Sequence, residues 1–292
     1  MATVYIAETG DDSTGDGTQD NPYLTLSKAN TESDVGDTIL IMNGTYTVTS
    51  NNYNMTANRI YTGESIGGAI LDGGNSNPAI AIGNINWEVT INNITFQNFI
   101  RSSGSTPHTI QVDTGTTHYA ILNNCIIRNI TIFSTSSGHS QAAVFTNGAG
   151  GRTQLELNGC LFDTIDAYPG SAQNRSIIQL YSSSNLKINA CTFYLKETDN
   201  ITVQSIIGRF SHNLDILEVK NSILYADASL SIGLVSATEL TGNSGYNCRY
   251  NVGYSFSHDG DITLDPKFID APNGDFRLQT NSPCLGTGNP AV

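Results

Sequence analysis

The sequence predicts one all-β domain, a parallel β-helix of about seven coils. Three observations lead to this prediction: a repeat of about 31 residues, a bend inside each copy, and a further short strand between copies. A helical solenoid is excluded because no 3.6-residue period is present. A β-sandwich is disfavoured because its hairpin turns would follow one another at closer spacing.

Five segments of the repeat align without gaps, and they begin 31, 35, 31 and 31 residues apart. The copies are residues 91–96, 122–127, 157–162, 188–193 and 219–224, with a weaker one at 245–250. Apolar residues recur at four positions of the repeat: two residues before the first residue of a segment, at that first residue, and three and five residues after it. Because inward side chains recur every second residue of a strand, this change of parity predicts a two-residue bend. Asn and Gly, which tolerate left-handed backbone, fill most of these bends.

A third strand precedes each bend by about ten residues, which completes a three-stranded coil. The clear examples are residues 79–82, 109–112, 142–145, 177–180 and 231–235, whereas 206–210 fits less well. Variable loops, such as 102–107 and 134–140, follow the bend strands, and in solenoids such insertions collect on one face.

The ends of a solenoid need caps because they expose strand edges and apolar interior. Residues 21–29 predict a short N-terminal cap helix with Pro22 near its start and Leu26 and Ala29 on one side. The Gly- and Pro-rich C-terminal segment predicts the other cap. The single domain, 1–292, therefore divides into an N-terminal part (1–60), coils (61–260) and a C-terminal cap (261–292).

Two buried columns are expected along the coils. The first contains Ile94, Cys125, Cys160, Cys191 and Ser222, with Cys248 in the weaker copy; the second contains Phe96, Ile127, Phe162, Phe193 and Leu224. The cysteines lack zinc-type pair spacing, and in-register neighbours are badly oriented for a disulfide, so we expect buried free thiols.

Both ends of the chain resemble a known family. The N-terminal pattern comprises Val4-Tyr-Ile-Ala-Glu-Thr-Gly, Asn21-Pro-Tyr, Gly36-Asp-Thr-Ile-Leu and Asn43-Gly-Thr-Tyr. At the other end are Asp265-Pro-Lys-Phe, Asn273-Gly-Asp-Phe and Ser282-Pro-Cys. Together they resemble right-handed parallel β-helix proteins of the pectate-lyase-like superfamily, of the phage, archaeal and bacterial surface type. The resemblance implies right-handed winding and an Asn ladder at the bends, but the superfamily includes lyases, hydrolases, epimerases, adhesins and phage tailspikes. A departure is Cys284-Leu-Gly-Thr-Gly, where many relatives have an Ala-Ile-Asp-Ala-Gly-like run.

Composition narrows the function classes. The 292 residues carry a formal charge of −13, and only 13% of them are charged. An acidic surface without a basic stripe excludes a non-specific nucleic-acid binder. No apolar run is long enough for a membrane span, and no secretory signal is visible.

Candidate catalytic groups are few. The lyases of this superfamily use a Lys or Arg base, usually with calcium. The outward candidates for such a base are Arg128 and Arg249. The favoured interpretation of both residues is a solvated surface arginine. Asp163 and Asp166 form the closest carboxylate pair within a repeat, and a hydrolase needs two carboxylates about 5–9 Å apart. Asp12 and Asp16, in the turn 11–17, resemble the start of a calcium loop without its closing glutamate. A structural turn is favoured there, and we expect no cofactor apart from a weak calcium site.

One outward face stands out as a candidate binding surface. It consists of Ile126, Arg128, Leu161, Asp163, Tyr194, Ile223 and Tyr225. Its branched apolar residues exceed what a solvated face needs. Three alternatives stay open: a covering segment of the same chain, a homo-oligomer (a trimer by analogy), or glycan binding.

The leading functional interpretation is a non-enzymatic structural β-helix of a virion or cell surface, such as a spike, fibre or decoration protein. Its expected partners are surface glycans or other surface proteins, and neither nucleic acid nor membrane insertion. The alternative is a secreted polysaccharide lyase or glycoside hydrolase of the same fold.

Overall fold

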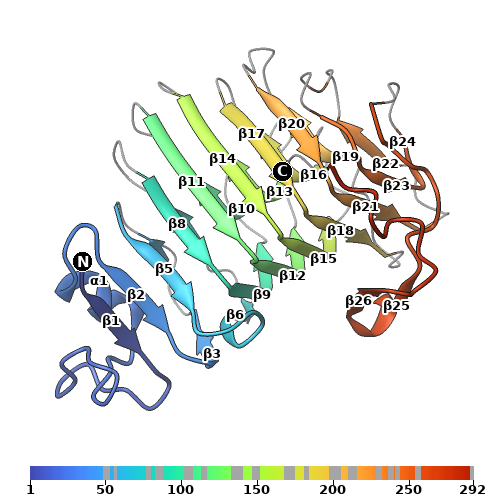
Figure 1. Cartoon of the computed structure of the whole chain (residues 1–292). Helices are drawn as coiled ribbons and strands as arrows, with labels where there is room; N and C mark the ends of the chain where they lie inside the picture. Colours follow the sequence, from blue (N-terminus) through green and yellow to red (C-terminus); the bar gives the residue numbers. More distant parts are fainter. Residues whose placement is uncertain are drawn as a thin grey trace.

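The chain forms a β-solenoid in which parallel strands stack coil upon coil (Figure 1). The computed structural model describes residues 1–48, 53–55, 58–76, 80–82, 88–101, 108–112, 117–132, 141–146, 152–167, 175–180, 184–196, 205–209, 216–227, 232–235, 240, 244–253 and 258–289. The variable loops 102–107 and 134–140 lie outside these residues.

Three parallel sheets, each of eight strands in the described part of the chain, form the walls. Sheet A contains β1 (Thr3–Ile6), β2 (Thr38–Ile41), β5 (Ile60–Gly63), β8 (Glu88–Asn92), β11 (Thr117–Asn123), β14 (Arg152–Asn158), β17 (Ser184–Asn189) and β20 (Leu217–Lys220). Sheet B contains β3 (Gly44–Thr47), β6 (Ala69–Ser76), β9 (Ile94–Arg101), β12 (Ile126–Ile132), β15 (Leu161–Ala167), β18 (Thr192–Leu195), β21 (Ile223–Ala226) and β23 (Cys248–Tyr250). Sheet C contains β4 (Tyr53–Met55), β7 (Ile80–Ile82), β10 (His108–Val112), β13 (Gln141–Thr146), β16 (Arg175–Leu180), β19 (Ser205–Arg209), β22 (Ile232–Val235) and β24 (Val252–Gly253). The predicted all-β parallel solenoid is confirmed, and residues 205–209 form a third strand like the others.

The predicted bends connect sheet A to sheet B. Their second residues have left-handed backbone, with φ between 52° and 63°. These residues are Asn93, Asn124, Gly159, Ala190 and Asn221. The preceding Asn side chains form a ladder: Asn123 donates to Asn92 at 2.9 Å, and Asn158 donates to Asn123 at 3.0 Å. The ladder links the first three of these bends by side-chain hydrogen bonds between coils, which compensate for the left-handed conformation.

The two predicted core columns are confirmed for the five aligned copies, because each of those ten residues is at most 1% exposed. Phe162 and Phe193 stack with ring centroids 4.6 Å apart. The placement of Cys248 in the first column is wrong. Cys248 pairs with Ile223, and Asn247 instead meets Ser222, whose backbone N–H it accepts at 3.0 Å.

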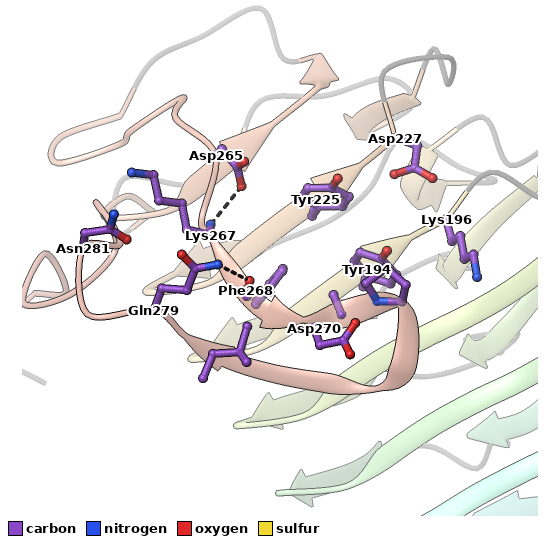
Figure 2. Close-up of a pocket in the computed structure, with 13 residues that line it drawn as sticks. Tyr194, Lys196, Tyr225, Asp227, Asp265, Lys267, Phe268, Asp270, Gln279 and Asn281 are labelled. Carbon is purple, nitrogen blue, oxygen red and sulfur yellow. Dashed lines mark hydrogen bonds between the residues drawn. The ribbon is translucent and has the colours of Figure 1, made fainter.

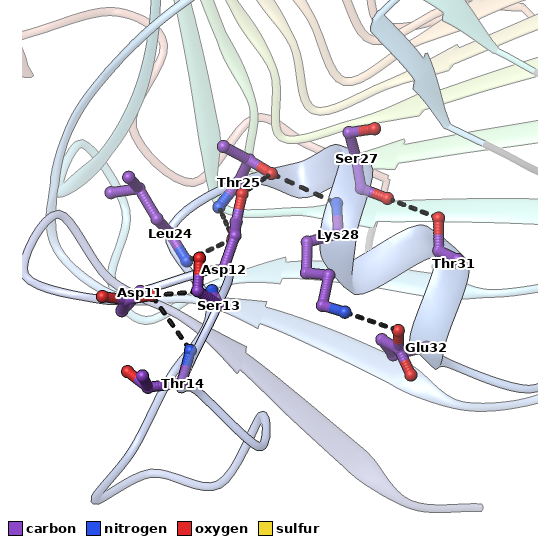
Figure 3. Close-up of polar contacts among 10 residues, drawn as sticks. All are labelled: Asp11, Asp12, Ser13, Thr14, Leu24, Thr25, Ser27, Lys28, Thr31 and Glu32. Carbon is purple, nitrogen blue, oxygen red and sulfur yellow. Dashed lines mark hydrogen bonds and ion pairs between the residues drawn. The ribbon is translucent and has the colours of Figure 1, made fainter.

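The cap helix α1 (Leu26–Glu32) begins five residues later than predicted (Figure 3). Thr25 is the N-cap and accepts the backbone N–H of Lys28 at 3.2 Å, so Pro22 lies before the helix. The buried side of the helix consists of Leu26 and Ala29, as predicted. This helix is too short to cross a membrane, and the described residues contain no helix that meets that requirement.

The C-terminal segment forms both a cap on the last coil and a separate hairpin. Ile262 pairs with Cys248 beyond the last coil, in the position of a cap. The chain then forms an antiparallel hairpin of β25 (Phe268–Asp270), the 3₁₀ turn η1 (Ala271–Asn273) and β26 (Asp275–Leu278). This hairpin projects beside the sheet B strands β18 and β21 in Figure 1.

Candidate functional site

The outer face of sheet B carries a continuous column of side chains, hereafter the outer column. Strand register aligns Asp72, Gln97, Arg128, Asp163, Tyr194, Tyr225 and Tyr250 in this order. The register predicted from the repeat is therefore confirmed for Arg128, Asp163, Tyr194 and Tyr225. Strand spacing of about 4.8 Å brings each side chain against the next.

The first half of the outer column is a polar chain. Gln97 donates to Asp72 at 2.8 Å, and Asn98 donates to the same carboxylate at 2.7 Å. Arg128 donates twice to Gln97 Oε1, from Nε at 2.9 Å and from Nη2 at 2.7 Å. These contacts fix the Arg128 guanidinium within the sheet face, so it is not the freely solvated arginine that the sequence favoured.

The two aspartates of this half respond in opposite ways to their surroundings. Burial acts to raise the pKa of Asp72, but hydrogen bonds from Gln97, the Gly74 N–H and Asn98 outweigh it, and the pKa is lowered. For Asp163, burial dominates and raises the pKa, although Thr164 and the charge of Arg128 act against it. The two pKa values shift in opposite directions because hydrogen bonds to the charged carboxylate outweigh burial at Asp72 but not at Asp163.

The second half of the outer column is aromatic. Tyr194 stacks on Tyr225 with centroids 5.0 Å apart, and Tyr225 stacks on Tyr250 at 5.3 Å. The hairpin adds Phe268 and Phe276, which meet Tyr194 edge-on at 6.2 and 5.2 Å. Tyr194 is consequently only 4% exposed. A segment of the same chain thus covers this part of the predicted binding face.

A groove of about 580 Å³ opens where the hairpin meets the tyrosines (Figure 2). Its sheet side includes Tyr194, Lys196, Tyr225 and Asp227. Its hairpin side includes Asp265, Lys267, Phe268, Ile269, Asp270, Ala271, Pro272, Gln279 and Asn281. The volume is in the range of small-molecule sites, which combine apolar walls with a few orienting polar groups.

The tyrosines present edges and hydroxyls to the groove, because their faces stack on each other. Burial, the nearby Asp227 charge and a hydrogen bond to Asp227 raise the pKa of Tyr225 to about 12. Burial, together with the charges of Asp227 and Asp163, also raises the pKa of Tyr194. Both hydroxyls therefore stay protonated at neutral pH. The Tyr225 O–H donates to Asp227, so its oxygen can accept a hydrogen bond from a ligand, and Asp227 keeps a second oxygen as an acceptor.

Backbone geometry shapes the hairpin side of the groove. Lys267 has left-handed backbone with φ 54°, and its N–H donates to Asp265 Oδ1 at 2.8 Å. Gln279 holds the opposite strand by donating its side-chain amide to Phe268 O at 2.9 Å. A non-glycine residue in this conformation is uncommon, and the carboxylate contact of Asp265 compensates for part of its cost.

Sheet C offers no comparable open face in the part of the chain that the structure describes. Ile177 and Ile178 are adjacent in β16 and therefore point to opposite faces, yet both are fully buried. Ile206 and Ile207 in β19 show the same pattern. The groove beside sheet B is therefore the better candidate for a ligand.

The comparisons with known proteins give similarities of fold only. No family model matches the chain, and no curated protein matches it. Among solved structures, a rhamnogalacturonan lyase is 16% identical over 96% of this chain and 97% of its own, with a TM-score of 0.48. Pectin methylesterase PemA from Erwinia chrysanthemi is 15% identical over 90% of this chain and 80% of its own, with a TM-score of 0.49.

The topology is the stronger observation: three stacked parallel sheets joined by two-residue left-handed bends with an Asn ladder. The chain is a parallel β-helix. At this level of identity, the likeness concerns the fold alone.

The remaining predicted residues of this β-helix lie beside the outer column. Ile126 pairs with Leu161 on sheet B, and Ile223 continues the same column beyond Thr192; the three apolar side chains are half-buried. The sequence interpretation missed Lys196 and Asp227, although each stands two residues after a predicted tyrosine and so shares its face. The hairpin residues carried no comparable signal, because they lie outside the repeat.

Arg249 is another correction. It was expected to be a solvated surface arginine, but it is 7% exposed and its Nε lies 3.3 Å from Asp261 Oδ2. Asp261 also accepts the Asn247 N–H at 2.9 Å. This β-helix therefore uses Arg249 to attach its last coil to the C-terminal segment.

The predicted calcium candidates Asp12 and Asp16 have structural partners, and Figure 3 shows those of Asp12. Asp12 accepts the Leu24 and Thr25 N–H groups at 2.9 and 3.0 Å and the Thr25 hydroxyl at 2.6 Å. Asp16 accepts the N–H and hydroxyl of Thr18. Among the described residues, no group of three or more His, Cys, Asp and Glu side chains is placed to hold a metal. The contacts support the structural turn over a calcium loop.

Proposed function

We propose that this protein is a structural β-helix of a virion or cell surface that binds glycans in the groove beside the C-terminal hairpin. The observation that carries the proposal is the grouping of two tyrosine hydroxyls, carboxylates, lysines and side-chain amides around one groove. Such a set supplies both donors and acceptors to a ligand rich in hydroxyl groups. We also propose that the coils wind in the right-handed sense, since parallel crossover connections are almost always right-handed. The proposed number of coils is about seven.

The charges of the groove favour neutral or amino sugars over acidic ones. Asp227, Asp265 and Asp270 face two lysines, which leaves one excess negative charge. The whole chain adds a formal charge of −13, which repels anionic polymers. We therefore propose a neutral or cationic oligosaccharide as the ligand.

A glycan array that includes neutral, amino and acidic sugars tests this proposal. The wild-type protein should bind a subset of neutral or amino sugars, and Tyr225→Ala should lose the signal. Tyr119→Ala, on sheet A, is the matched control and should retain it. Absence of binding by the wild type, or equal binding by both variants, contradicts the proposal.

A polysaccharide hydrolase is the second candidate, because three carboxylates line the same groove and hydrolases use paired carboxylates. A screen for new reducing ends across polysaccharides distinguishes the two. Cleavage that Asp227→Asn and Asp265→Asn abolish supports the hydrolase. Binding without cleavage supports the structural role.

We also propose that the apolar column of Ile126, Leu161 and Ile223 contacts a second copy of the chain, with a trimer as the expected assembly. Its support is its half-buried position on the same outer face. The double variant Ile126→Asp with Ile223→Asp should turn an oligomer into a monomer in light scattering. An unchanged mass contradicts this part of the proposal.

A further inference from the structure

The C-terminal tail holds Cys284 at a fixed place against the last coil. Before it, Ser282 Oγ donates to Pro266 O at 2.5 Å. After it, the Asn289 N–H donates to Asn221 Oδ1 at 2.7 Å, which attaches the tail to the end of the Asn ladder. The Cys284 N–H itself donates to Ser282 Oγ at 3.1 Å. The backbone on both sides of the thiol is thus anchored.

Cys248 lies opposite, in the last strand of sheet B. It is 3% exposed, and its Sγ donates to Leu264 O at 3.2 Å. Its thiol is also in hydrogen-bonding contact with the Cys284 thiol. Leu264, which accepts from Cys248, lies two residues before Pro266, which accepts from Ser282 beside Cys284, so both cysteines lie at the same part of the tail. Two neighbouring thiols on anchored backbone meet the first requirement for a disulfide, which is proximity.

The two thiols differ in reactivity. The interaction between the two thiols lowers the pKa of Cys284, whereas the same interaction and burial raise the pKa of Cys248. Cys284 is also partly exposed, while Cys248 is buried. Cys284 is therefore the thiol that forms the thiolate and that a reagent in solution can reach.

We propose that Cys248 and Cys284 are a disulfide-forming pair that joins the C-terminal tail, just after the hairpin, to the last coil when a low-molecular-weight disulfide is present. The Cys284 thiolate attacks one sulfur of oxidised glutathione, which forms a mixed disulfide and releases one glutathione thiolate. The Cys248 thiolate then attacks Cys284 Sγ and releases the second glutathione. The two cysteine protons pass to the two glutathione thiols, and the glutathione disulfide is the group reduced.

The other three cysteines provide an internal contrast. Cys125, Cys160 and Cys191 are at most 1% exposed and lie inside the coils. Their Sγ atoms donate to the carbonyls of Ile91, Leu122 and Leu157, respectively, at 3.3–3.5 Å. Without access to solvent, these thiols stay reduced under the same treatment.

The bond would close a loop between residues 36 positions apart that contains the whole hairpin. It would restrict the unfolded chain and hold the hairpin at its base. This inference goes beyond the proposed function and does not depend on any ligand.

The test uses the full-length protein, treated with oxidised glutathione or with dithiothreitol, then denatured, alkylated and mapped by non-reducing peptide mass spectrometry. One linked pair, Cys248–Cys284, should form, and the melting temperature should rise by several degrees over the reduced protein. Cys284→Ser should abolish both effects, and the matched control Cys125→Ala should retain both. A free Cys248 after treatment, a stable glutathione adduct on Cys284, or any link within the Cys125–Cys160–Cys191 column overturns the inference.

Discussion

The two halves of the outer column occupy equivalent places on one sheet but differ in chemistry. Asp72, Gln97 and Arg128 make a chain of side-chain hydrogen bonds along the face. Tyr194 and Tyr225 make an aromatic stack that the C-terminal hairpin partly covers. The comparison shows that the solenoid supplies only the spacing, whereas the residues on each coil decide whether the face stays open or receives a covering segment.

The largest expected loss of stability is for a residue of the interior, next to a residue of the outer column. Phe193 points inward and stacks on Phe162, while its neighbour Tyr194 points outward. Phe193→Ala should lower the free energy of unfolding by about 3–5 kcal/mol, as truncations of packed aromatics do. Equilibrium denaturation measures the change, and a loss below about 1 kcal/mol would show that the inward register is wrong.

The aromatic half should contribute more to stability than the polar half. Tyr194→Ala removes a side chain that is 4% exposed and packed against Phe268 and Phe276, so we expect a loss of about 2 kcal/mol. Arg128→Ala should cost about 1 kcal/mol or less, because its hydrogen-bond partner lies at a partly exposed face. Denaturation of both variants measures the difference, and the reverse order would contradict the comparison.

The bend ladder should give a smaller effect. Asn123 donates to Asn92 and accepts from Asn158, so Asn123→Ala breaks two hydrogen bonds at the partly exposed bend. We expect a loss of about 1 kcal/mol in unfolding free energy. Lys187→Ala, on the outer face of sheet A, is a control that removes only a surface ion pair and should change stability less. Equal losses would mean that the ladder adds nothing to the bends.

The smallest expected effects are on the pH dependence of the unfolding free energy. The contributions of Asp72 and Asp163 to this dependence should have opposite signs. The lowered pKa of Asp72 means that its stabilising contribution exists above the unfolded-state pKa and is lost as the pH falls through the folded value. The raised pKa of Asp163 means that stability falls as the pH rises from the unfolded to the folded value.

At neutral pH, Asp72→Asn should therefore lose the stabilisation that the charged Asp72 provides, and Asp163→Asn should lose the charge penalty. The pH-linked difference from wild type should disappear below the lowered folded-state pKa for Asp72→Asn, and below the ordinary aspartate pKa for Asp163→Asn. Urea denaturation across this pH range measures both differences. The same sign of pH dependence for the two variants would contradict the electrostatic assignment.

The repeat made most of the fold predictable, because inward and outward positions follow directly from the two-residue period of strands. It gave the alignment of Arg128, Asp163, Tyr194 and Tyr225 on one face. It failed at Cys248, where the shorter final repeat puts Asn247 in the expected cysteine position.

The candidate site was only half predictable. Tyr194 and Tyr225 belong to the repeat, but Phe268 and Phe276 reach them from a segment with no periodic signal. A contact between residues so distant in sequence depends on how the tail crosses the coils, which local pattern does not encode. The buried pair of Arg249 and Asp261 was missed for the same reason.

We propose that the ligand binds in the groove at the aromatic half of the outer column. The direct measurement is isothermal titration calorimetry of a sugar that the array identifies, with Lys196→Ala and Arg128→Ala compared with the wild type. Lys196 lines the groove and Arg128 lies in the polar half. We expect at least a tenfold loss of affinity for Lys196→Ala, about 1.4 kcal/mol, with wild-type affinity for Arg128→Ala. Loss of binding in Arg128→Ala with full binding in Lys196→Ala would contradict the proposal.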